Sequence, residues 1–296
     1  MLDAFKCWGY EMKICWFGDN QLGLVEGDAV RDVSAALKVL PSPRYPAPKG
    51  DPLIANLPLI RAEIAKIAPS AKTFAVKDVR LLSPIASPTK IIGTPVNYLK
   101  HIEEADAQRE VFSNRNRGSI EEQGLFLKAT SSLVGPGEGV KLRFLDRRTD
   151  HEMELGVVIG TFANNIAEAR ALDYVAGYCI ALDMVVRGSE DRSFRKSIDT
   201  YAVAGPWLVT ADEIQAPGRL KFSLSVNGEV RQASDTQFMI MSIERQIAWA
   251  STWYPLYPGD IIMTGTCEGV SRVVPGDVMH CEIEQIGAMD VAISAA

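Results

Sequence analysis

Apolar and polar residues alternate in short runs through much of the chain, a pattern typical of half-buried β-strands. Residues 12–37 give strand-like runs separated by turn residues, and residues 53–67 carry Leu and Ile at helical spacing. A proline-rich stretch, residues 41–52, separates them. Short β-type segments fill the second half, where Asn227 and Gly228 give the clearest hairpin signal because both residues tolerate positive φ. The pattern predicts an α+β protein whose second half is mainly β.

The chain divides into a smaller and a larger part. Prolines interrupt the strand-like stretch at residues 77–93, and we expect a domain boundary there. The division would separate a small N-terminal α+β domain over residues 1–80 from a catalytic domain over residues 81–296. Near the start of the second part, residues 97–115 carry polar and charged residues throughout and predict a helix.

Composition limits the possible functions. The chain has 296 residues, of which 47% are hydrophobic, and its net charge of −6 disfavours a dedicated nucleic-acid binder, which needs a basic face. Five scattered cysteines without a CxxC pair indicate a reducing compartment. No run approaches the roughly 18 apolar residues that cross a bilayer, and the first residues lack the pattern of a signal peptide. We therefore expect a cytoplasmic protein that neither binds nucleic acid nor enters a membrane.

Three acidic residues lie where apolar residues are expected. Glu152 and Glu154 occupy one face of a predicted strand, about 6–7 Å apart. A solvated edge strand would give the same pattern. Asp183, however, lies inside the apolar run of residues 177–186, where an unpaired carboxylate costs several kcal/mol. Either Arg187 pairs with Asp183, or the three acids surround a cation that offsets their mutual repulsion.

The ligand type indicates which cation this would be. Oxygen ligands alone select Mg²⁺, Mn²⁺ or Ca²⁺, whereas Zn²⁺ prefers His and Cys. Mg²⁺ keeps several of its waters, so three carboxylates would leave room for two oxygens of a bidentate substrate. His151 adjoins Glu152 but falls on the opposite face of the strand. We therefore expect His151 to be a packing residue and not a metal ligand.

Further residues could supply catalytic groups. His101 and Glu104 share a helix face at spacing i, i+3, so the carboxylate could orient the imidazole as a general base, although a solvated helix face has the same pattern. Lys196 precedes an apolar run and is either a surface lysine or a cation that stabilises negative charge in a site. The turn of residues 264–269 could present N–H groups and hydroxyls to an anion.

These segments together resemble the fumarylacetoacetate hydrolase family over roughly residues 85–296. The resemblance runs in order through NYLKHIEE, SSLVGPGEGV, HEMELGVVIG, LDYVAGYCIALDMVVR, KSIDTYAVAGPWLVT, VNGEVRQ, PGDIIMTGTCEGV and PGDVMHCEIEQIG. It implies a mixed β-roll catalytic core with a small N-terminal domain, and a homodimer. It also implies Mg²⁺ or Mn²⁺ held by Glu152, Glu154 and Asp183.

Other positions match the family one by one. His101 and Glu104 match its His-x-x-Glu dyad, which lies on a lid-like helix that closes over substrate. Lys196 matches the lysine of its KSF block, Thr266 the second threonine of its TGT turn, and Arg187 the arginine after the metal-binding aspartate. The resemblance implies catalytic roles for His101, Glu104 and Lys196 and substrate binding by Arg187 and Thr266.

The chain also departs from the family pattern. Gly188 and Glu190 stand where the family often has Asp and Gln, and the segment that leads to Lys196 is short. The family's Lys-Pro pair becomes Lys128 followed by alanine, and Cys267 replaces the proline of TGTP. We assign Glu190 to substrate binding, where a carboxylate in place of an amide would weaken the binding of an anionic group.

The family acts on 2-oxo acids and 1,3-dicarbonyl compounds, and three functions follow from the resemblance. The leading hypothesis is Mg²⁺-dependent hydrolysis of a C–C bond in an acylpyruvate of the fumarylpyruvate type. The second is isomerisation or decarboxylation of a hydroxymuconate-like or 2-hydroxyhepta-2,4-dienedioate-like diacid at the same site. The third is a non-catalytic binding protein that keeps the fold.

Overall fold

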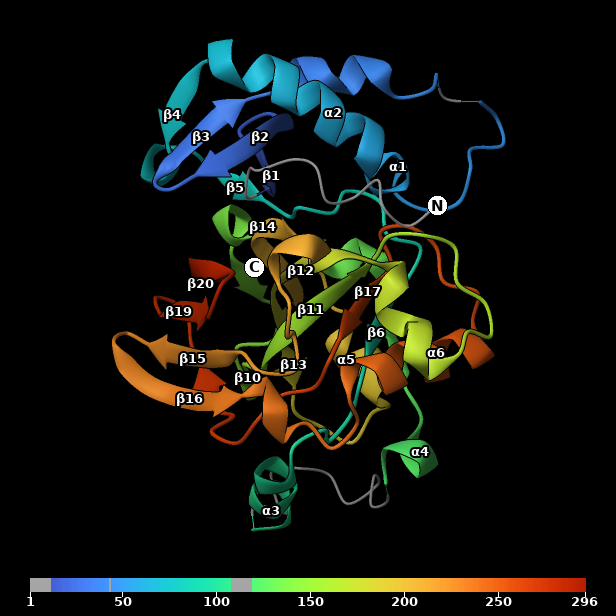
Figure 1. Ribbon diagram of the computed structural model, residues 1–296. Coiled ribbons are helices and arrows are strands. Elements are labelled where there is room, and N and C mark those ends of the chain that lie inside the picture. Colours follow the sequence, from blue (N-terminus) through green and yellow to red (C-terminus); the bar gives the residue numbers. More distant parts are fainter. Residues whose placement is uncertain (1–11, 43, 108–118) are drawn as a thin grey trace.

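A large mixed sheet forms the centre of the molecule (Figure 1). The structure is a computed structural model that describes residues 12–42, 44–107 and 119–296. Twelve strands belong to this sheet: β1 (Lys13–Phe17), β2 (Gln21–Glu26), β3 (Ala29–Asp32), β4 (Thr73–Ala75), β5 (Leu81–Leu82), β6 (Ile91–Gly93), β7 (Phe126–Lys128), β8 (Leu133–Val134), β11 (Met153–Ile159), β12 (Val175–Asp183), β14 (Ala202–Thr210) and β17 (Ile261–Met263). The main path runs β4-β3-β2-β1-β14-β12-β11-β17-β6-β7, with β5 on β1 and β8 on β14.

Two smaller sheets, six α-helices and eight short 3-10 helices complete the described structure. A five-stranded sheet has the order β16-β15-β19-β20-β9, and a three-stranded sheet has the order β13-β10-β18. The strands of these two sheets are β9 (Val140–Leu142), β10 (Thr149–Asp150), β13 (Val185–Val186), β15 (Lys221–Val226), β16 (Glu229–Asp235), β18 (Arg272–Val273), β19 (Val278–Ile283) and β20 (Gly287–Ala295). The helices are α1 (Pro52–Ala55), α2 (Leu57–Ile67), α3 (Leu99–Ala107), α4 (Ile120–Gln123), α5 (Arg192–Lys196) and α6 (Ile243–Trp253). The predicted α+β class is confirmed.

The N-terminal strands continue the central sheet. β1, β2, β3 and β4 pair antiparallel in sequence order, and β1 then pairs with β14 through Lys13 opposite Val209. The predicted helix over residues 53–67 is two helices, α1 and α2, and Ile60 and Ile64 of α2 are buried against this sheet. The N-terminal part lies at the top of Figure 1. The domain boundary after residue 80 stays a prediction. The two sides of this boundary share one sheet, since β1 pairs with both β14 and β5.

The central strands explain why acidic residues there are not solvated. Every residue of β11 is buried, and β11 lies between β12 and β17. It is therefore an interior strand of the sheet and not an edge strand. The register places Met153 opposite Leu182 and Glu154 opposite Ala181. The carboxylate of Glu154 thus points into the protein from a strand that is covered on both faces.

Turn and helix predictions can be compared with the described segments. The β15–β16 hairpin turns at Asn227 and Gly228, which have φ values of 52° and 84°, as predicted. Of the helix predicted over residues 97–115, the structure has α3 over Leu99–Ala107, and residues 108–115 lie outside the described residues. Within the described ranges, no helix is long and apolar enough to cross a membrane.

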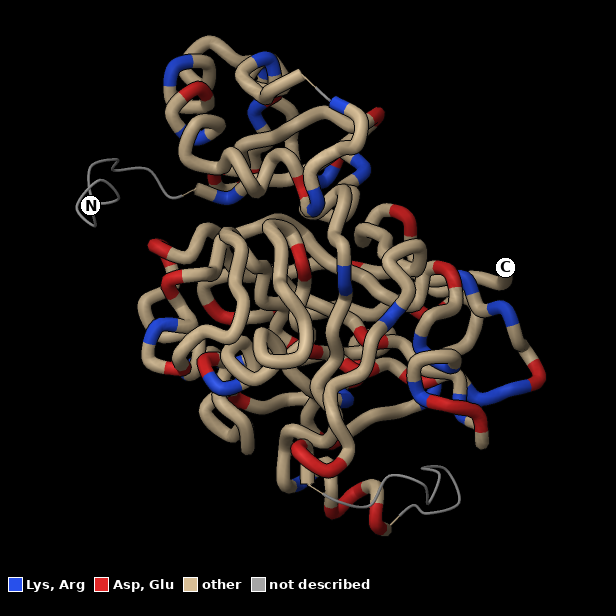
Figure 2. The backbone as a smooth tube through the Cα atoms, turned by 90° about the vertical axis from the view of Figure 1, so that its right-hand side faces the viewer, with Lys and Arg blue, Asp and Glu red and all other residues tan. Residues whose placement is uncertain are grey.

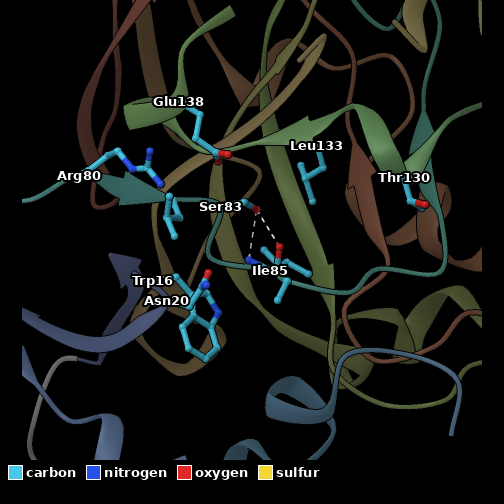
Figure 3. A pocket seen from close by; sticks show the side chains of 10 residues that line it. Trp16, Asn20, Arg80, Ser83, Ile85, Thr130, Leu133 and Glu138 are labelled. Atoms are coloured by element: carbon cyan, nitrogen blue, oxygen red, sulfur yellow. Dashed lines mark hydrogen bonds between the residues drawn. The ribbon is translucent and has the colours of Figure 1, made fainter. Parts of the chain in front are cut away.

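Charged residues of both signs are interspersed over the two parts of the chain (Figure 2). Where the N-terminal strands meet the core there is a hollow of about 390 Å³, seen from close by in Figure 3. Its walls include Trp16 of β1, Arg80, and Thr130 and Leu133 of the core. None of the three acidic residues singled out above lines this hollow.

Asp51 joins the N-terminal helices to the start of the larger part. Its side chain caps α1, where one carboxylate oxygen accepts hydrogen bonds from the N–H groups of Leu53 (2.9 Å) and Ile54 (3.2 Å). The other oxygen accepts from the N–H groups of Ala86 and Ser87, both at 2.9 Å. Asp51 is only 2% exposed, so no water replaces these partners easily.

We predict that Asp51→Asn lowers the free energy of unfolding by about 1–3 kcal/mol, the cost of leaving buried donors without an acceptor. An amide NH₂ would face two backbone N–H groups in place of one carboxylate oxygen. Urea denaturation of the variant measures the change. Asp28→Asn, at an exposed turn, is the control and should leave stability unchanged. Equal midpoints for Asp51→Asn and the parent protein would contradict this account.

Candidate active site

Three carboxylates meet at the ends of two paired central strands. Glu152 precedes β11, Glu154 lies within it, and Asp183 is the last residue of β12. The backbone N–H of Asp183 donates to the carbonyl of Glu152 (2.8 Å), which fixes the register at this point. Ligand oxygens of the three acids lie within 4.8 Å of one another, and all three residues are buried. The structure thus brings together the predicted metal ligands.

Two lysines enter the same cluster. Nζ of Lys196 donates to Oε2 of Glu152 (2.5 Å) and to Asp183. Nζ of Lys128 donates to the other oxygen of Asp183 and to the carbonyl of Tyr201 (2.9 Å). The sequence analysis assigned Lys196 to the site but gave Lys128 no role there. Lys128 ends β7 and shares a face with the buried Phe126, but this local pattern does not indicate a carboxylate partner.

The cations of the cluster compensate Glu152 more than Glu154. Burial alone would raise the pKa of Glu152, but the cations of Lys196 and Arg187 hold it at about 2. Burial raises the pKa of Glu154 well above its ordinary value, and repulsion from Asp183 adds to the effect. Glu154 is therefore the acid of the cluster whose charge is least compensated by these cations. An oxygen-preferring divalent cation fits this donor set, because it would offset the repulsion that these side chains leave.

The two predicted substrate-binding residues of the neighbouring loop have protein partners. Nε of Arg187 donates to Asp150 (2.7 Å), and its Nη2 donates to Oε1 of Glu152 (3.0 Å). Arg187 thereby orients a predicted metal ligand. Both carboxylate oxygens of Glu190 accept from Arg147, at 3.0 and 2.8 Å. Substrate binding by Arg187 and Glu190 stays a prediction.

The predicted dyad forms and is attached to the turn of residues 264–269. Nδ1 of His101 lies 3.1 Å from Oε2 of Glu104, and Oε1 of Glu104 accepts from the N–H of Gly269 (3.0 Å). At the other end of the turn, the N–H of Gly265 donates to Oε2 of Glu154 (2.7 Å). One short segment therefore connects the dyad to the acid cluster.

Thr266 also belongs to this turn. Its hydroxyl donates to the carbonyl of Met153 (2.8 Å) and accepts from Nε2 of Gln232 (2.8 Å). Gln232 in turn contacts Nδ1 of His151 (3.1 Å) through its amide oxygen. Burial lowers the pKa of His151 to about 4, so this ring is neutral near pH 7 and packs behind the site, as expected. Nothing in the sequence pattern indicated Gln232, because its partners come from distant segments.

Known proteins similar to this chain give an independent comparison. The family model "Fumarylacetoacetate (FAA) hydrolase C-terminal" matches residues 90–294. Maleylpyruvate hydrolase of Aquipseudomonas alcaligenes is 53% identical over 286 residues, which cover 95% of this chain and 99% of the relative. A mitochondrial oxaloacetate tautomerase, Fahd2a of Rattus norvegicus, is 37% identical over 223 residues, which cover 71% of this chain and 68% of the relative.

A solved structure agrees with these relatives. The crystal structure of maleylpyruvate hydrolase from Sphingobium sp. SYK-6, in complex with manganese (II) ion and pyruvate, superimposes with a TM-score of 0.82. It is 37% identical, and the match covers 96% of this chain and 100% of that chain. The predicted fold is therefore confirmed. The chain belongs to the fumarylacetoacetate hydrolase family and is a metal-dependent hydrolase.

Proposed function

We propose that this enzyme hydrolyses the C–C bond of an acylpyruvate, with a divalent metal held by Glu152, Glu154 and Asp183. The observation that carries the proposal is the burial of these carboxylates within 4.8 Å of one another, beside a turn whose Gly265 and Gly269 N–H groups bind Glu154 and the Glu104 of a His–Glu dyad. The relative named maleylpyruvate hydrolase and the similar structure with manganese and pyruvate support the substrate class. The metal would supply Lewis acidity to the oxygens of a 2-oxo acid.

His101 is the general base in this proposal, and Glu104 is the group that orients it. His101 takes a proton from a water molecule, whose oxygen forms a bond to the distal acyl carbonyl carbon. The carboxylate of Glu104, 3.1 Å away, stabilises the imidazolium. Lys196 stabilises the negative charge that develops on the carbonyl oxygen. Thr266 is the second group proposed for this role, and its hydroxyl would exchange its hydrogen bond to the Met153 carbonyl for one to that oxygen.

The second half of the reaction breaks the C–C bond. The electron pair of the bond between the acyl carbonyl and the methylene passes to the pyruvate part as its enolate. The methylene carbon then takes the proton back from His101. The products are pyruvate and the carboxylic acid of the acyl part, so one water molecule is consumed and the dyad returns to its starting state.

A second candidate keeps the site and omits the water. Isomerisation or decarboxylation of a hydroxymuconate-like diacid needs only enolate formation and protonation, and the relative named oxaloacetate tautomerase supports this class. Product analysis by NMR distinguishes the two reactions. We expect fumarylpyruvate to give equal amounts of pyruvate and fumarate, whereas an isomer of unchanged mass would favour the second candidate.

Three finer properties complete the proposal. We infer Mg²⁺ as the native ion, with Mn²⁺ or Ca²⁺ as alternatives, because all three ligands are carboxylates. We also infer a homodimer on the resemblance to the family, and a cytoplasmic location because the four cysteines of the described residues are free. Light scattering of the purified protein tests the dimer, and metal analysis of the protein as isolated tests the ion.

We predict that Glu154→Gln has opposite effects on stability and activity. The pKa of Glu154 is raised by burial and by Asp183, so the folded protein loses stability as pH rises through the range where this carboxylate ionises. A neutral amide at this position removes that repulsion and keeps an acceptor for Gly265. The ion-free variant should therefore have a higher Tm than ion-free parent protein near pH 7.

The same variant should lose its response to metal. Mg²⁺ with oxalate should raise the Tm of the parent protein but not that of Glu154→Gln, and hydrolysis should fall at least about 100-fold because a ligand is lost. Asp199→Asn, an exposed residue, is the control. A Mg²⁺-induced rise in Tm equal to that of the parent protein would refute the assignment of Glu154 as a ligand.

We predict that His101→Ala lowers kcat for fumarylpyruvate by about 10²- to 10⁴-fold, the usual contribution of a general base. The metal ligands are unchanged, so the variant should keep the Mg²⁺-induced rise in Tm. His280→Ala is the matched control, because that ring pairs with Asp290 on the surface. Undiminished turnover by His101→Ala would exclude this histidine as the base.

A further inference from the structure

Gln232 is a buried polar residue in a strand that is largely exposed. Its neighbour Arg231 in β16 is exposed, whereas Gln232 is 0% exposed. In the pairing of β15 with β16 the register shifts after Leu224, which faces Gln232, so Arg231 is the extra residue of a β-bulge. Bulges of this kind re-aim side chains and are common beside active sites. Gly269 approaches this bulge so closely that a Cβ atom there would overlap the carbonyl oxygen of Arg231.

The side-chain amide of Gln232 connects the strand of the metal ligands to the turn of residues 264–269. Its oxygen accepts from the backbone N–H of Met153 (3.0 Å) and lies 3.1 Å from Nδ1 of His151. Its nitrogen donates to the hydroxyl of Thr266 (2.8 Å) and to the carbonyl of Cys267 (3.0 Å). These four contacts use both lone pairs and both hydrogens of the amide. The buried amide therefore cannot turn over without losing its partners.

The direction of these hydrogen bonds is fixed by groups that act in only one way. The N–H of Met153 only donates and the carbonyl of Cys267 only accepts, so the amide nitrogen of Gln232 faces the turn. The hydroxyl of Thr266 must then accept from Gln232. Its single hydrogen is left for another acceptor, which is the carbonyl of Met153 (2.8 Å) in this structure.

His151 extends this chain of hydrogen bonds away from the turn. The amide oxygen of Gln232 can only accept, so Nδ1 of His151 carries the hydrogen of the neutral ring described above. Nε2 of His151 then accepts from the hydroxyl of Ser271 (2.9 Å). Each donor of the chain, from Ser271 through His151 and Gln232, therefore points toward Thr266.

We propose that Gln232 is a positioning residue for the reaction, because it keeps the hydroxyl of Thr266 as an acceptor toward the protein and its hydrogen as a donor toward the substrate. The inference rests on the proposed function, in which Thr266 stabilises the charge on the carbonyl oxygen. Aligned hydrogen bonds also polarise the last donor of a chain, which strengthens the bond that it makes. This charge develops only in the transition state, so the effect should fall on kcat and not on KM.

The test is a double-mutant cycle between Gln232 and Thr266, measured on the hydrolysis of fumarylpyruvate. Thr266→Val should lower kcat about 10²- to 10³-fold, the usual loss for one donor to an oxyanion. Gln232→Met should lower kcat about 10-fold, as for the loss of one neutral hydrogen bond, and leave KM within about twofold. In the Thr266→Val background, Gln232→Met should change kcat by less than about twofold, because the hydroxyl through which it acts is gone.

A merely structural glutamine gives a different result in this cycle. Equal losses from Gln232→Met in both backgrounds, or no loss in the parent enzyme, would overturn the role of Gln232. Mg²⁺ with oxalate should still raise the Tm of Gln232→Met, and loss of that rise would assign the effect to the metal ligands and also overturn the inference. Gln215→Met, which changes an exposed glutamine, is the matched control and should leave kcat unchanged.

A second variant serves if Gln232→Met does not fold. Gln232→Glu keeps an acceptor for the N–H of Met153 but has at most one hydrogen to donate to the turn. It should lower kcat in the parent enzyme and have less than about a twofold effect beside Thr266→Val, and an undiminished loss there would refute the inference. A parent enzyme that does not cleave fumarylpyruvate would instead refute the proposed function, together with the inference built on it.

Discussion

The compensation of buried negative charge is the constraint on which this structure depends. Three carboxylates lie within 4.8 Å of one another in the interior, where each charge would be costly alone. Lys196 and Lys128 both donate to Asp183, and Arg187 donates to Glu152. These cations come from α5, β7 and the loop after β13, so the fold must bring distant segments together before the acids can be buried. These cations compensate Glu154 least, and its remaining repulsion with Asp183 is what a divalent ion would offset.

Part of this arrangement could be predicted from the sequence. Asp183 inside an apolar run, and Glu152 and Glu154 two residues apart, indicated a cluster because a carboxylate seldom lies in such places without a partner. The class of fold and the turn at Asn227 followed from local patterns. The contact of Lys128 with Asp183 could not be predicted from local patterns. A single lysine in a three-residue strand does not indicate a carboxylate partner that lies 55 residues later in the chain.

What the sequence left open was settled by neighbours that are distant along the chain. Glu-x-Glu suits an edge strand and an interior strand equally, and only the pairing of β11 with both β12 and β17 decides between them. The hydroxyl of Thr266, for which substrate binding stays a prediction, contacts Met153 and Gln232, two partners that local sequence did not indicate. Residue type and spacing therefore located the acids and the dyad. The partners that orient them depend on the tertiary fold.

The pairing of β1 with β14 makes the N-terminal segment part of the same sheet as the catalytic region. The region that the family model matches, residues 90–294, contains β14 but not the strand that covers its hydrogen-bonding groups at Leu208 and Val209. Excised alone, that region would expose backbone donors and acceptors along an apolar strand, the kind of edge at which sheets of different molecules join. The N-terminal segment therefore covers an edge of the catalytic region, so a variant cut back to residues 90–294 is not the same folding unit as the full chain.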